Sequence, residues 1–249
     1  ITAWIFDNGK LFTAGKGVDG HLGDNVDRGG NEVESRTPVQ ISTGITNWAN
    51  VFGGKGDHVF AITEDGHLYN WGTSIEGIVG NGTQNQNLRV PTRVGTDTDW
   101  AKVAMSGEHA VGLKTDGTIY CTGNGGNGAT GQGNESNIST WAQVGTDTDW
   151  CHITAGTQMC GALKTNGKMY RWGNGNNGRS GNGNNVSASV PTQVGTDTDW
   201  YDMAASTVGW VAIKVNGTAY AWGANVQGQL GINNVLDTSV PTQIGSLDT

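Results

Sequence analysis

The sequence repeats itself about every 50 residues, and this periodicity limits the possible folds more than any other feature. The string Gly-Thr-Asp-Thr-Asp-Trp ends at Trp100, Trp150 and Trp200, and a looser version ends at Trp48. A period of this length is typical of solenoids and propellers, in which one supersecondary unit stacks on the next. We therefore expect a repeat array, in which each unit buries its apolar residues against its neighbours.

Other residues recur at fixed positions within this period. Each unit has a glycine that follows Asp or Asn, and three units then carry the dipeptide Trp-Gly. The repeated residues are Gly66, Gly117, Gly167 and Gly217 in the turns, and Trp71, Trp172 and Trp222 in the dipeptides. Thr122 and Ala14 take the place of the tryptophan in the other two units. Because Trp100, Trp150 and Trp200 share one sequence context, we expect them to share one buried environment, and we assign the dipeptide tryptophans to packing between units.

One unit, residues 100–149, shows how the repeat is expected to fold. Alternating apolar residues and turn signals predict four short strands. The strands are expected at 100–105, 110–114, 119–122 and about 140–144. Asp116-Gly117 is typical of a type I′ hairpin turn. The fourth strand carries proline in the sister units (Pro38, Pro91, Pro191 and Pro241) and Trp141 here, and proline marks it as an edge strand.

Composition agrees with a strand-rich fold and excludes several classes of function. Glycine accounts for 42 of 249 residues, which penalises helix interiors, whereas ten tryptophans supply a core that a disordered glycine-rich chain lacks. No apolar run approaches the roughly 18 residues of a membrane helix, so membrane insertion is not expected. The net charge is −8 and no basic cluster occurs, which disfavours nucleic acid and anionic membrane surfaces as partners.

The fold class predicted from these patterns is all-β, a β-propeller of about five four-stranded blades. Residues 1–249 form one domain, with units at approximately 1–47, 48–99, 100–149, 150–199 and 200–249. The five units could close into a small ring or form part of a larger seven-bladed ring. Their near-equal lengths favour the small ring.

Three blocks of sequence carry a resemblance to a known family. They are MSGEHAVGLKTDGTIY, TAGTQMCGALKTNGKMYRWGNGNNG and AYAWGANVQGQLGINN. They resemble the regulator of chromosome condensation repeat, whose blades form a seven-bladed propeller, and the resemblance covers essentially the whole chain. The histidine that this family places before its second strand is matched by His58 and His109 and replaced by Met159 and Gly209. The family's Gly-Gln-Leu-Gly element is intact only at residues 228–231.

The repeated acidic residues are the only candidates for a metal site. They are Asp97, Asp99, Asp147, Asp149, Asp197 and Asp199. Alternating carboxylates could hold calcium, but calcium takes six to eight oxygen ligands and no third acid lies nearby in the sequence. Aspartate also caps turns by accepting hydrogen bonds from its own backbone two residues on, and this structural role is the favoured interpretation.

No pattern in the sequence predicts an enzyme or a cofactor site. The Gly- and Asn-rich loops, such as residues 173–185, resemble phosphate-binding loops only superficially, because no helix follows them. No nucleophile–base motif occurs, and the five histidines lack metal-ligand spacing. The long loops differ between units, for example 72–87 against 123–137, and loops on a rigid frame commonly carry binding.

Three functions remain open. The favoured one is a non-enzymatic structural or adhesive module that binds other proteins of a larger assembly. Its acidic repeats, rich in Asn, Gly and Thr, resemble the versions of this family carried by phage and bacterial surface proteins, so the expected location is a virion, as decoration or fibre, or the extracellular surface. The alternatives are a regulator like a guanine-nucleotide exchange factor, and a multivalent lectin that binds glycans. Family exchange factors use a β-wedge and basic segments, whereas the insertion here is short, between Asp24 and Glu34, and basic segments are missing.

Overall fold

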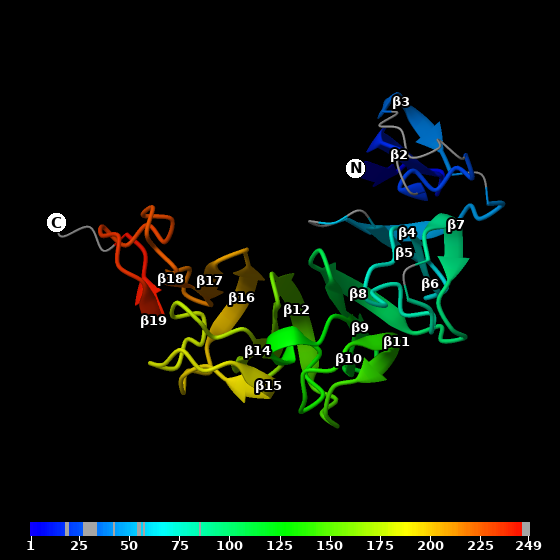
Figure 1. Cartoon of the computed structure of the whole chain (residues 1–249). Helices are drawn as coiled ribbons and strands as arrows, with labels where there is room; N and C mark the ends of the chain where they lie inside the picture. The colour runs from blue at the N-terminus through cyan, green and yellow to red at the C-terminus, as the bar shows by residue number, and fades with distance from the viewer. Residues whose placement is uncertain are drawn as a thin grey trace.

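The computed structural model describes residues 1–17, 20–26, 34–41, 43–53, 56, 58–84 and 86–245. These residues form five antiparallel sheets, the first with three strands and the others with four (Figure 1). The described part of the chain contains no α-helix, and its 3-10 turn η2 spans Gly126–Gly128. No helix long and apolar enough to cross a membrane is found among these residues. The predicted all-β class is confirmed.

The strands are β1 (Thr2–Ile5), β2 (Leu11–Lys16), β3 (Glu34–Gln40), β4 (Trp48–Gly53), β5 (His58–Thr63), β6 (Leu68–Gly72), β7 (Leu88–Arg93), β8 (Trp100–Met105), β9 (His109–Lys114), β10 (Ile119–Gly123), β11 (Ile138–Gln143), β12 (Trp150–Gly156), β13 (Met159–Lys164), β14 (Met169–Gly173), β15 (Ala188–Gln193), β16 (Trp200–Ala205), β17 (Gly209–Lys214), β18 (Ala219–Gly223) and β19 (Thr238–Gln243). We call the sheets blades 1 to 5 in chain order: β1–β3, β4–β7, β8–β11, β12–β15 and β16–β19. Within each blade the strands are paired in chain order.

The prolines lie where the sequence predicts them, on edge strands. Pro38, Pro91, Pro191 and Pro241 belong to β3, β7, β15 and β19. Each of these strands is the last of its sheet, and Figure 1 shows them at the outer rim. An outer strand leaves one row of backbone N–H groups unpaired, so the N–H that proline lacks costs no ladder hydrogen bond.

The hairpins between second and third strands differ from the predicted type I′ turn. In blade 3 the Gly117 N–H donates to the Lys114 carbonyl (3.1 Å), and the Lys114 N–H donates to the Thr118 carbonyl (3.0 Å). Gly117 has φ of +80°, but Asp116 does not have a positive φ. This is a type I turn followed by a left-handed glycine. The Asp116 carboxylate accepts from the Thr118 N–H and hydroxyl (2.9 and 2.6 Å), which favours the right-handed turn.

The blades stand along an open arc rather than a closed ring. Each blade packs on the next one in the chain, through β1 on β4, β4 on β8, β9 on β12 and β13 on β16. In Figure 1 the described parts of blades 1 and 5 lie at the two ends of the arc, with the other three between them. The small five-bladed ring favoured from the unit lengths is therefore wrong. The rotation from blade to blade is set by the side chains packed between them, and after four such rotations blade 5 does not reach blade 1 (Figure 1).

The apolar core lies between the blades. Four buried clusters fill the four blade-to-blade contacts, and each is built around tryptophan. Trp100, Trp150 and Trp200 are 3, 4 and 4% exposed, so the shared buried environment predicted for them is confirmed. Trp71, Trp172 and Trp222 are fully buried and take part in the same clusters.

Each long loop carries the same short motif, and in blades 1 to 4 this motif contacts an indole of the following blade. Gly-x-x-Gly occurs at residues 20–23, 77–80, 128–131, 178–181 and 228–231. The Trp71, Trp172 and Trp222 indoles of one blade lie against the second glycine of the preceding blade. A β-carbon on Gly23, Gly131 or Gly181 would lie 2.7, 3.1 or 2.8 Å from the respective indole nitrogen. These glycines therefore leave the space that the indoles fill.

Blade 3 places this indole by a different route. Thr122 stands in the third strand where blades 2, 4 and 5 have tryptophan, but Trp141 in the fourth strand sends its ring to the same kind of position. A β-carbon on Gly80 of blade 2 would overlap the Trp141 indole nitrogen. Trp141 also packs edge-on against Phe60, with ring centroids 5.8 Å apart. Trp141 in the fourth strand therefore fills the place of the tryptophan that Thr122 replaces in the third strand.

Candidate functional site

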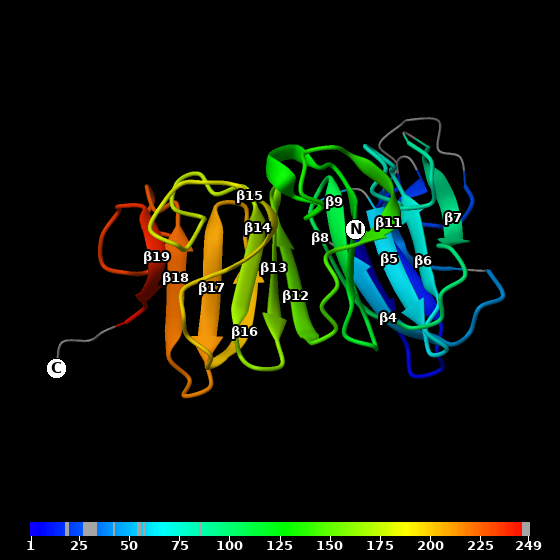
Figure 2. The ribbon, with the colours of Figure 1, turned by 90° about the horizontal axis from the view of Figure 1, so that it is seen from below.

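The order of the strands divides the molecule into two opposite faces (Figure 2). We call one the turn face. It carries the hairpins 64–67, 115–118, 165–168 and 215–218 and the linkers 94–99, 144–149 and 194–199. The other is the loop face. It carries the turns 106–108, 157–158 and 206–208 between first and second strands, and the long loops 73–84 with 86–87, 124–137, 174–187 and 224–237.

In each of blades 3 to 5, a lysine on the turn face forms ion pairs with the two repeated aspartates of the preceding linker. Nζ of Lys164 lies 2.7 Å from Oδ2 of Asp147 and 2.8 Å from Oδ1 of Asp149. The same ammonium lies over the rings of Trp150 and Tyr170, at 4.8 and 5.3 Å from their centroids. Burial alone would lower the pKa of Lys164, but its hydrogen bonds to the two carboxylates outweigh burial and raise that pKa. The equivalent clusters are Lys114 with Asp97 and Asp99, and Lys214 with Asp197 and Asp199.

These clusters explain the Thr-Asp-Thr-Asp strings without a metal ion. Each acidic pair already has a cation between its carboxylates, and among the described residues no three His, Cys, Asp or Glu side chains gather as a metal site requires. In blade 2, Ile45 and Asn47 stand at the two acidic positions and Thr63 replaces the lysine. Lysine and acidic pair therefore occur together or not at all, as expected for an ion-paired unit.

The repeated turn glycines also have a packing role. Gly66, Gly117 and Gly167 have φ between +74° and +80°, and a β-carbon on each would overlap the carbonyl oxygen of the threonine in the following linker. The Trp150 N–H donates to the Gly117 carbonyl (3.1 Å). The repeated residues of the turn face are thus committed to contacts within the repeat itself, which leaves the loop face as the candidate site.

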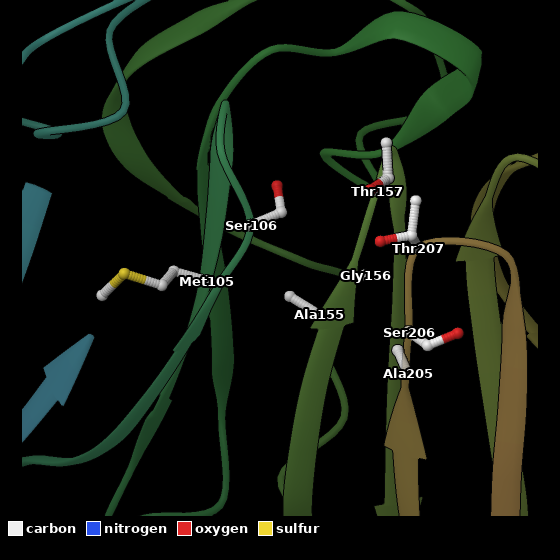
Figure 3. A pocket seen from close by; sticks show the side chains of 8 residues that line it. All are labelled: Met105, Ser106, Ala155, Gly156, Thr157, Ala205, Ser206 and Thr207. Atoms are coloured by element: carbon white, nitrogen blue, oxygen red, sulfur yellow. The ribbon is translucent and has the colours of Figure 1, made fainter. Parts of the chain in front are cut away.

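A hollow opens on the loop face where blades 3, 4 and 5 approach one another (Figure 3). Its volume is about 220 Å³, and it is lined by Met105, Ser106, Ala155, Gly156, Thr157, Ala205, Ser206 and Thr207. The lining is made of hydroxyls, apolar groups and backbone from the ends of β8, β12 and β16 and from the turns that follow these strands. Such a surface can hydrogen-bond a ligand, but these eight residues supply no acid or base that titrates near neutral pH.

A second hollow of about 230 Å³ adjoins the first and leads into a network of amides and carboxylates. Glu108 and Gln158 help to line it. Nδ2 of Asn124 donates to Oε2 of Glu76 (2.6 Å) and to Oε2 of Glu108 (3.2 Å). Nδ2 of Asn127 donates to Oε1 of Gln158 (3.0 Å). Side-chain hydrogen bonds therefore join blades 2, 3 and 4 across this face.

One serine–histidine pair borders these hollows, and its geometry indicates a structural role. Oγ of Ser106 lies 2.8 Å from Nδ1 of His109, and Nε2 of His109 lies 3.4 Å from the Met159 carbonyl oxygen. Burial lowers the pKa of His109 to about 4, so the ring is neutral at pH 7 and a weak base. In blade 5, Ser206 makes the same backbone contacts to Gly209 with no histidine present. The serine therefore serves the turn in both blades.

The long loops are divided between packing and exposure. Their Gly-x-x-Gly parts hold the indoles of the next blade, so only the tips are free for binding. The tip of blade 3 is polar, whereas the tip of blade 5 exposes Val235 and Leu236 by 59% and 71%. The described carboxylates of this face include Glu76, Glu108, Glu135 and Asp237. The loop face is therefore acidic and differs in chemistry from blade to blade.

The repeat matches a known family model over more than half of the chain. The model described as the regulator of chromosome condensation (RCC1) repeat matches residues 65–113, 166–208 and 216–249, and a second model of this repeat matches residues 100–129. The chain belongs to the RCC1 repeat family. The resemblance carried by the three sequence blocks is confirmed. The match at residues 65–113 begins before β6 of blade 2 and ends in β9 of blade 3, so it spans parts of two neighbouring blades.

Curated RCC1-repeat relatives match about half of this chain. "E3 ubiquitin-protein ligase HERC2" of Homo sapiens is 29% identical over 140 residues, which are 55% of this chain and 3% of that protein. "Regulator of chromosome condensation" of Mus musculus is 28% identical over 139 residues, which are 53% of this chain and 30% of that protein. The chain thus spans less than a third of the length of either relative.

Solved RCC1 propellers share the fold over almost the whole chain. Human WBSCR16 superposes with a TM-score of 0.84 and 21% identity, covering 98% of this chain and 64% of that one. Yeast RCC1 (Prp20), in its complex with Kap60, superposes with a TM-score of 0.81 and 20% identity, covering 98% and 59%. The five-blade arc therefore corresponds to about three fifths of each of those chains.

Proposed function

We propose that this RCC1-repeat chain is a protein-interaction module that binds a partner protein on its loop face and catalyses no reaction. The observation that carries the proposal is the contrast between the faces. Repeated residues on the turn face are used up in ion pairs and close packing, whereas the loop face offers hydroxyl-lined hollows and tips that differ in every blade. A rigid repeated frame with one variable face suits a heterologous partner.

The chemistry of the loop face favours a partner surface that is cationic or uncharged. Its carboxylates at Glu108, Glu135 and Asp237 are exposed, and the chain as a whole carries −8. Like charges would repel an anionic partner during approach. Among the fold neighbours, Prp20p of Saccharomyces cerevisiae is described together with its binding properties to Gsp1p and histones, which supports protein binding as the use of this fold.

We further propose that the partner belongs to a larger assembly, a virion with this module as decoration or fibre, or a cell surface. Support comes from the sequence alone, from near-identical acidic repeats rich in Asn, Gly and Thr. Mass spectrometry of the native assembly tests the location, since it identifies the proteins that accompany the chain. Recovery with chromatin or with a small GTPase instead would contradict it. The multivalent lectin is less well supported, because identical sugar sites need identical loop tips.

Capture of the partner from the native source tests the loop face directly. We expect the double variant Glu108→Lys/Glu135→Lys to lose the captured protein. The matched control is Asp7→Lys/Glu64→Lys, which makes the same change in net charge with exposed residues of the turn face. Equal loss in both variants would show that overall charge decides binding, and no loss in either would remove the loop face as the site.

A nucleotide exchange factor is the second candidate, because curated relatives include regulators of chromosome condensation and Prp20p binds Gsp1p. The insertion after Asp24 that could act as a wedge lies largely outside the described residues. A nucleotide-release assay on a panel of small GTPases decides between the two proposals. Accelerated release would overturn the non-catalytic function, and unchanged release together with partner capture would support it.

A further inference from the structure

Two cysteines of neighbouring blades meet at the interface of blades 3 and 4. Cys121 of β10 and Cys160 of β13 are fully buried free thiols, and both belong to the apolar cluster that fills this interface. Cys121 stands opposite Val111 in the ladder of blade 3, on the side that packs on blade 4. The two thiols are in hydrogen-bonding contact with each other. Two nucleophilic side chains thus touch in the core, and binding on the loop face uses neither of them.

Both cysteines depart from the repeat, and they do so together. In the other four-stranded blades, the ladder position of Cys121 carries Asn70, Arg171 and Ala221. The ladder position of Cys160 carries Val59, Ala110 and Trp210, each of which packs in the cluster shared with its preceding blade. Of the four interfaces between the described blades, only this one has cysteine at either position, and it has cysteine at both. The paired departure indicates that the two residues act on each other.

Burial decides when these thiols can react. It raises the pKa of Cys160 well above its usual range, and the contact with Cys121 raises that pKa further. Because the thiolate is the attacking form of cysteine, the closed interface keeps the pair as unreactive thiols. Before blades 3 and 4 pack during folding, both side chains are open to solvent and ionise near the ordinary pKa of about 8.5. A reaction between the two sulfurs therefore belongs to the folding of the chain.

We propose that Cys121 and Cys160 are a disulfide site, which links blade 3 to blade 4 when the chain folds in the presence of a small-molecule disulfide. One cysteine thiolate attacks the small disulfide, which forms a mixed disulfide and releases one small thiolate. The second cysteine thiolate then attacks the cysteine sulfur of the mixed disulfide and releases the other small thiolate. The protein loses two protons and two electrons in total, and the small disulfide is reduced to two thiols.

The cross-link strengthens the middle of the arc. It closes the loop between residues 121 and 160, which restricts the unfolded chain and thereby stabilises the folded one. Disulfides persist in oxidising surroundings and are rare in reducing ones, so the site suits the location proposed above, on a virion or a cell surface. The chemistry itself is tested with the isolated chain and does not depend on that location.

Refolding of the full chain with oxidised glutathione tests the site. Cys151→Ser removes the third thiol, which is exposed, and leaves the pair as the only cysteines. After refolding we expect the denatured protein to take up no iodoacetamide and to carry no glutathione, whereas the protein refolded with dithiothreitol alkylates at both cysteines. Cleavage before aspartate without reduction should yield residues 116–146 linked to residues 149–196. In urea, the unfolding equilibrium constant of the oxidised form should be at least about tenfold smaller than that of the reduced form.

Two single variants are matched controls, because the repeat itself carries alanine at both positions. Cys121→Ala and Cys160→Ala, each made in the Cys151→Ser chain, introduce the residue that stands at Ala221 in blade 5 and at Ala110 in blade 3. Each variant should keep one thiol that alkylates after denaturation with dithiothreitol. Neither variant should become more stable when oxidised glutathione replaces dithiothreitol during refolding.

The outcomes either support or overturn the inference. Linked peptides together with a gain in stability that needs both cysteines support it. Two thiols that still alkylate after refolding with oxidised glutathione, or that each carry glutathione, overturn it, because the interface then holds the sulfurs too far apart for a bond. A link between two chains instead of within one, or an equal gain in stability in either alanine variant, also overturns it. None of these readouts depends on the loop-face partner.

Discussion

The turn face and the loop face are built on the same strands, yet one is nearly identical in blades 3 to 5 and the other differs in each. On the turn face, a lysine, two aspartates and two aromatic rings contact one another within each blade, so changing one of them disturbs the others. On the loop face, the glycines that receive an indole and the serines Ser106 and Ser206 of the first turns are held by such contacts, whereas the tips of the long loops are not. The comparison shows that residues are repeated where they contact one another, and that the sequence differs between blades at the loop tips, where such contacts are missing.

The largest expected effect lies on the turn face, at the indole that begins β12. Trp150→Ala should lower the free energy of unfolding by about 3–5 kcal/mol, because it empties a buried aromatic site between two blades. Urea denaturation measures this loss. Tyr201→Ala is the control, since Tyr201 neighbours the equivalent Trp200 but is 72% exposed, and it should change stability by no more than about 0.5 kcal/mol. A similar loss in both variants would contradict the assignment of the core to these indoles.

Acidification should reveal the buried histidine at the loop-face end of β9. Burial lowers the pKa of His109 to about 4, whereas the pKa in the unfolded chain is about 6.5. Between pH 6.5 and pH 4, His109 is therefore protonated in the unfolded chain but not in the folded one. The free energy of unfolding is therefore unaffected by His109 above pH 6.5. It decreases as the pH falls from 6.5 to 4, by about 3 kcal/mol in total. Denaturation of the wild type and of His109→Gln at pH 7 and pH 4 checks this. Parallel pH curves for the two proteins would show that His109 is not responsible.

The turn glycines come next in size. Gly117→Ala should cost about 1–3 kcal/mol, because the residue has a positive φ and its β-carbon overlaps the Thr148 carbonyl of the linker. Gly145→Ala shares the positive φ (+65°) but has open space around it, so the difference between the two variants isolates the overlap. Thermal unfolding measures both. Equal losses would mean that backbone conformation alone, and not contact with the linker, requires glycine in the turn.

The ion-paired clusters should contribute less, because their carboxylates are half exposed. A double-mutant cycle of Lys164→Met and Asp147→Asn should give a coupling energy of about 0.5–1 kcal/mol, reduced by salt. The pKa of Lys164 is raised in the fold, so this coupling is present at neutral pH and is lost as pH rises through that raised value. If the coupling energy were zero even at low salt, the ion pair would not explain why the aspartates are repeated.

The smallest effect on stability is expected at the loop tips. Replacing residues 133–137 by the sequence of residues 183–187 keeps the length and the polar cap, since the Gly125 N–H donates to Asn137 and the Gly175 N–H donates to Ser187. We expect a change below about 0.5 kcal/mol, typical of surface substitutions, together with altered capture of the partner. A large loss of stability would show that the tips also belong to the frame.

Much of the frame could be predicted from local patterns. Turn glycines follow from the positive φ that hairpins need, and the edge position of the fourth strand follows from proline. The exact turn was missed, because the type I turn of Asp116 depends on the hydrogen bonds from Thr118 to its carboxylate. The acidic strings were assigned to turn capping, while the lysine 17 residues later that pairs with them was overlooked, although it is present whenever they are.

The sequence by itself determined the period, the strands of each blade and the membership of each residue in a repeat position, because these depend on contacts and conformations within a few residues. The tertiary structure decided the open arc, the seating of each indole on the preceding blade and the replacement of the missing tryptophan at Thr122 by Trp141. Those features join residues about 50 positions apart, such as Trp71 and His21. Spacing alone does not show which side chains meet across an interface, because that depends on how one blade is rotated against the next.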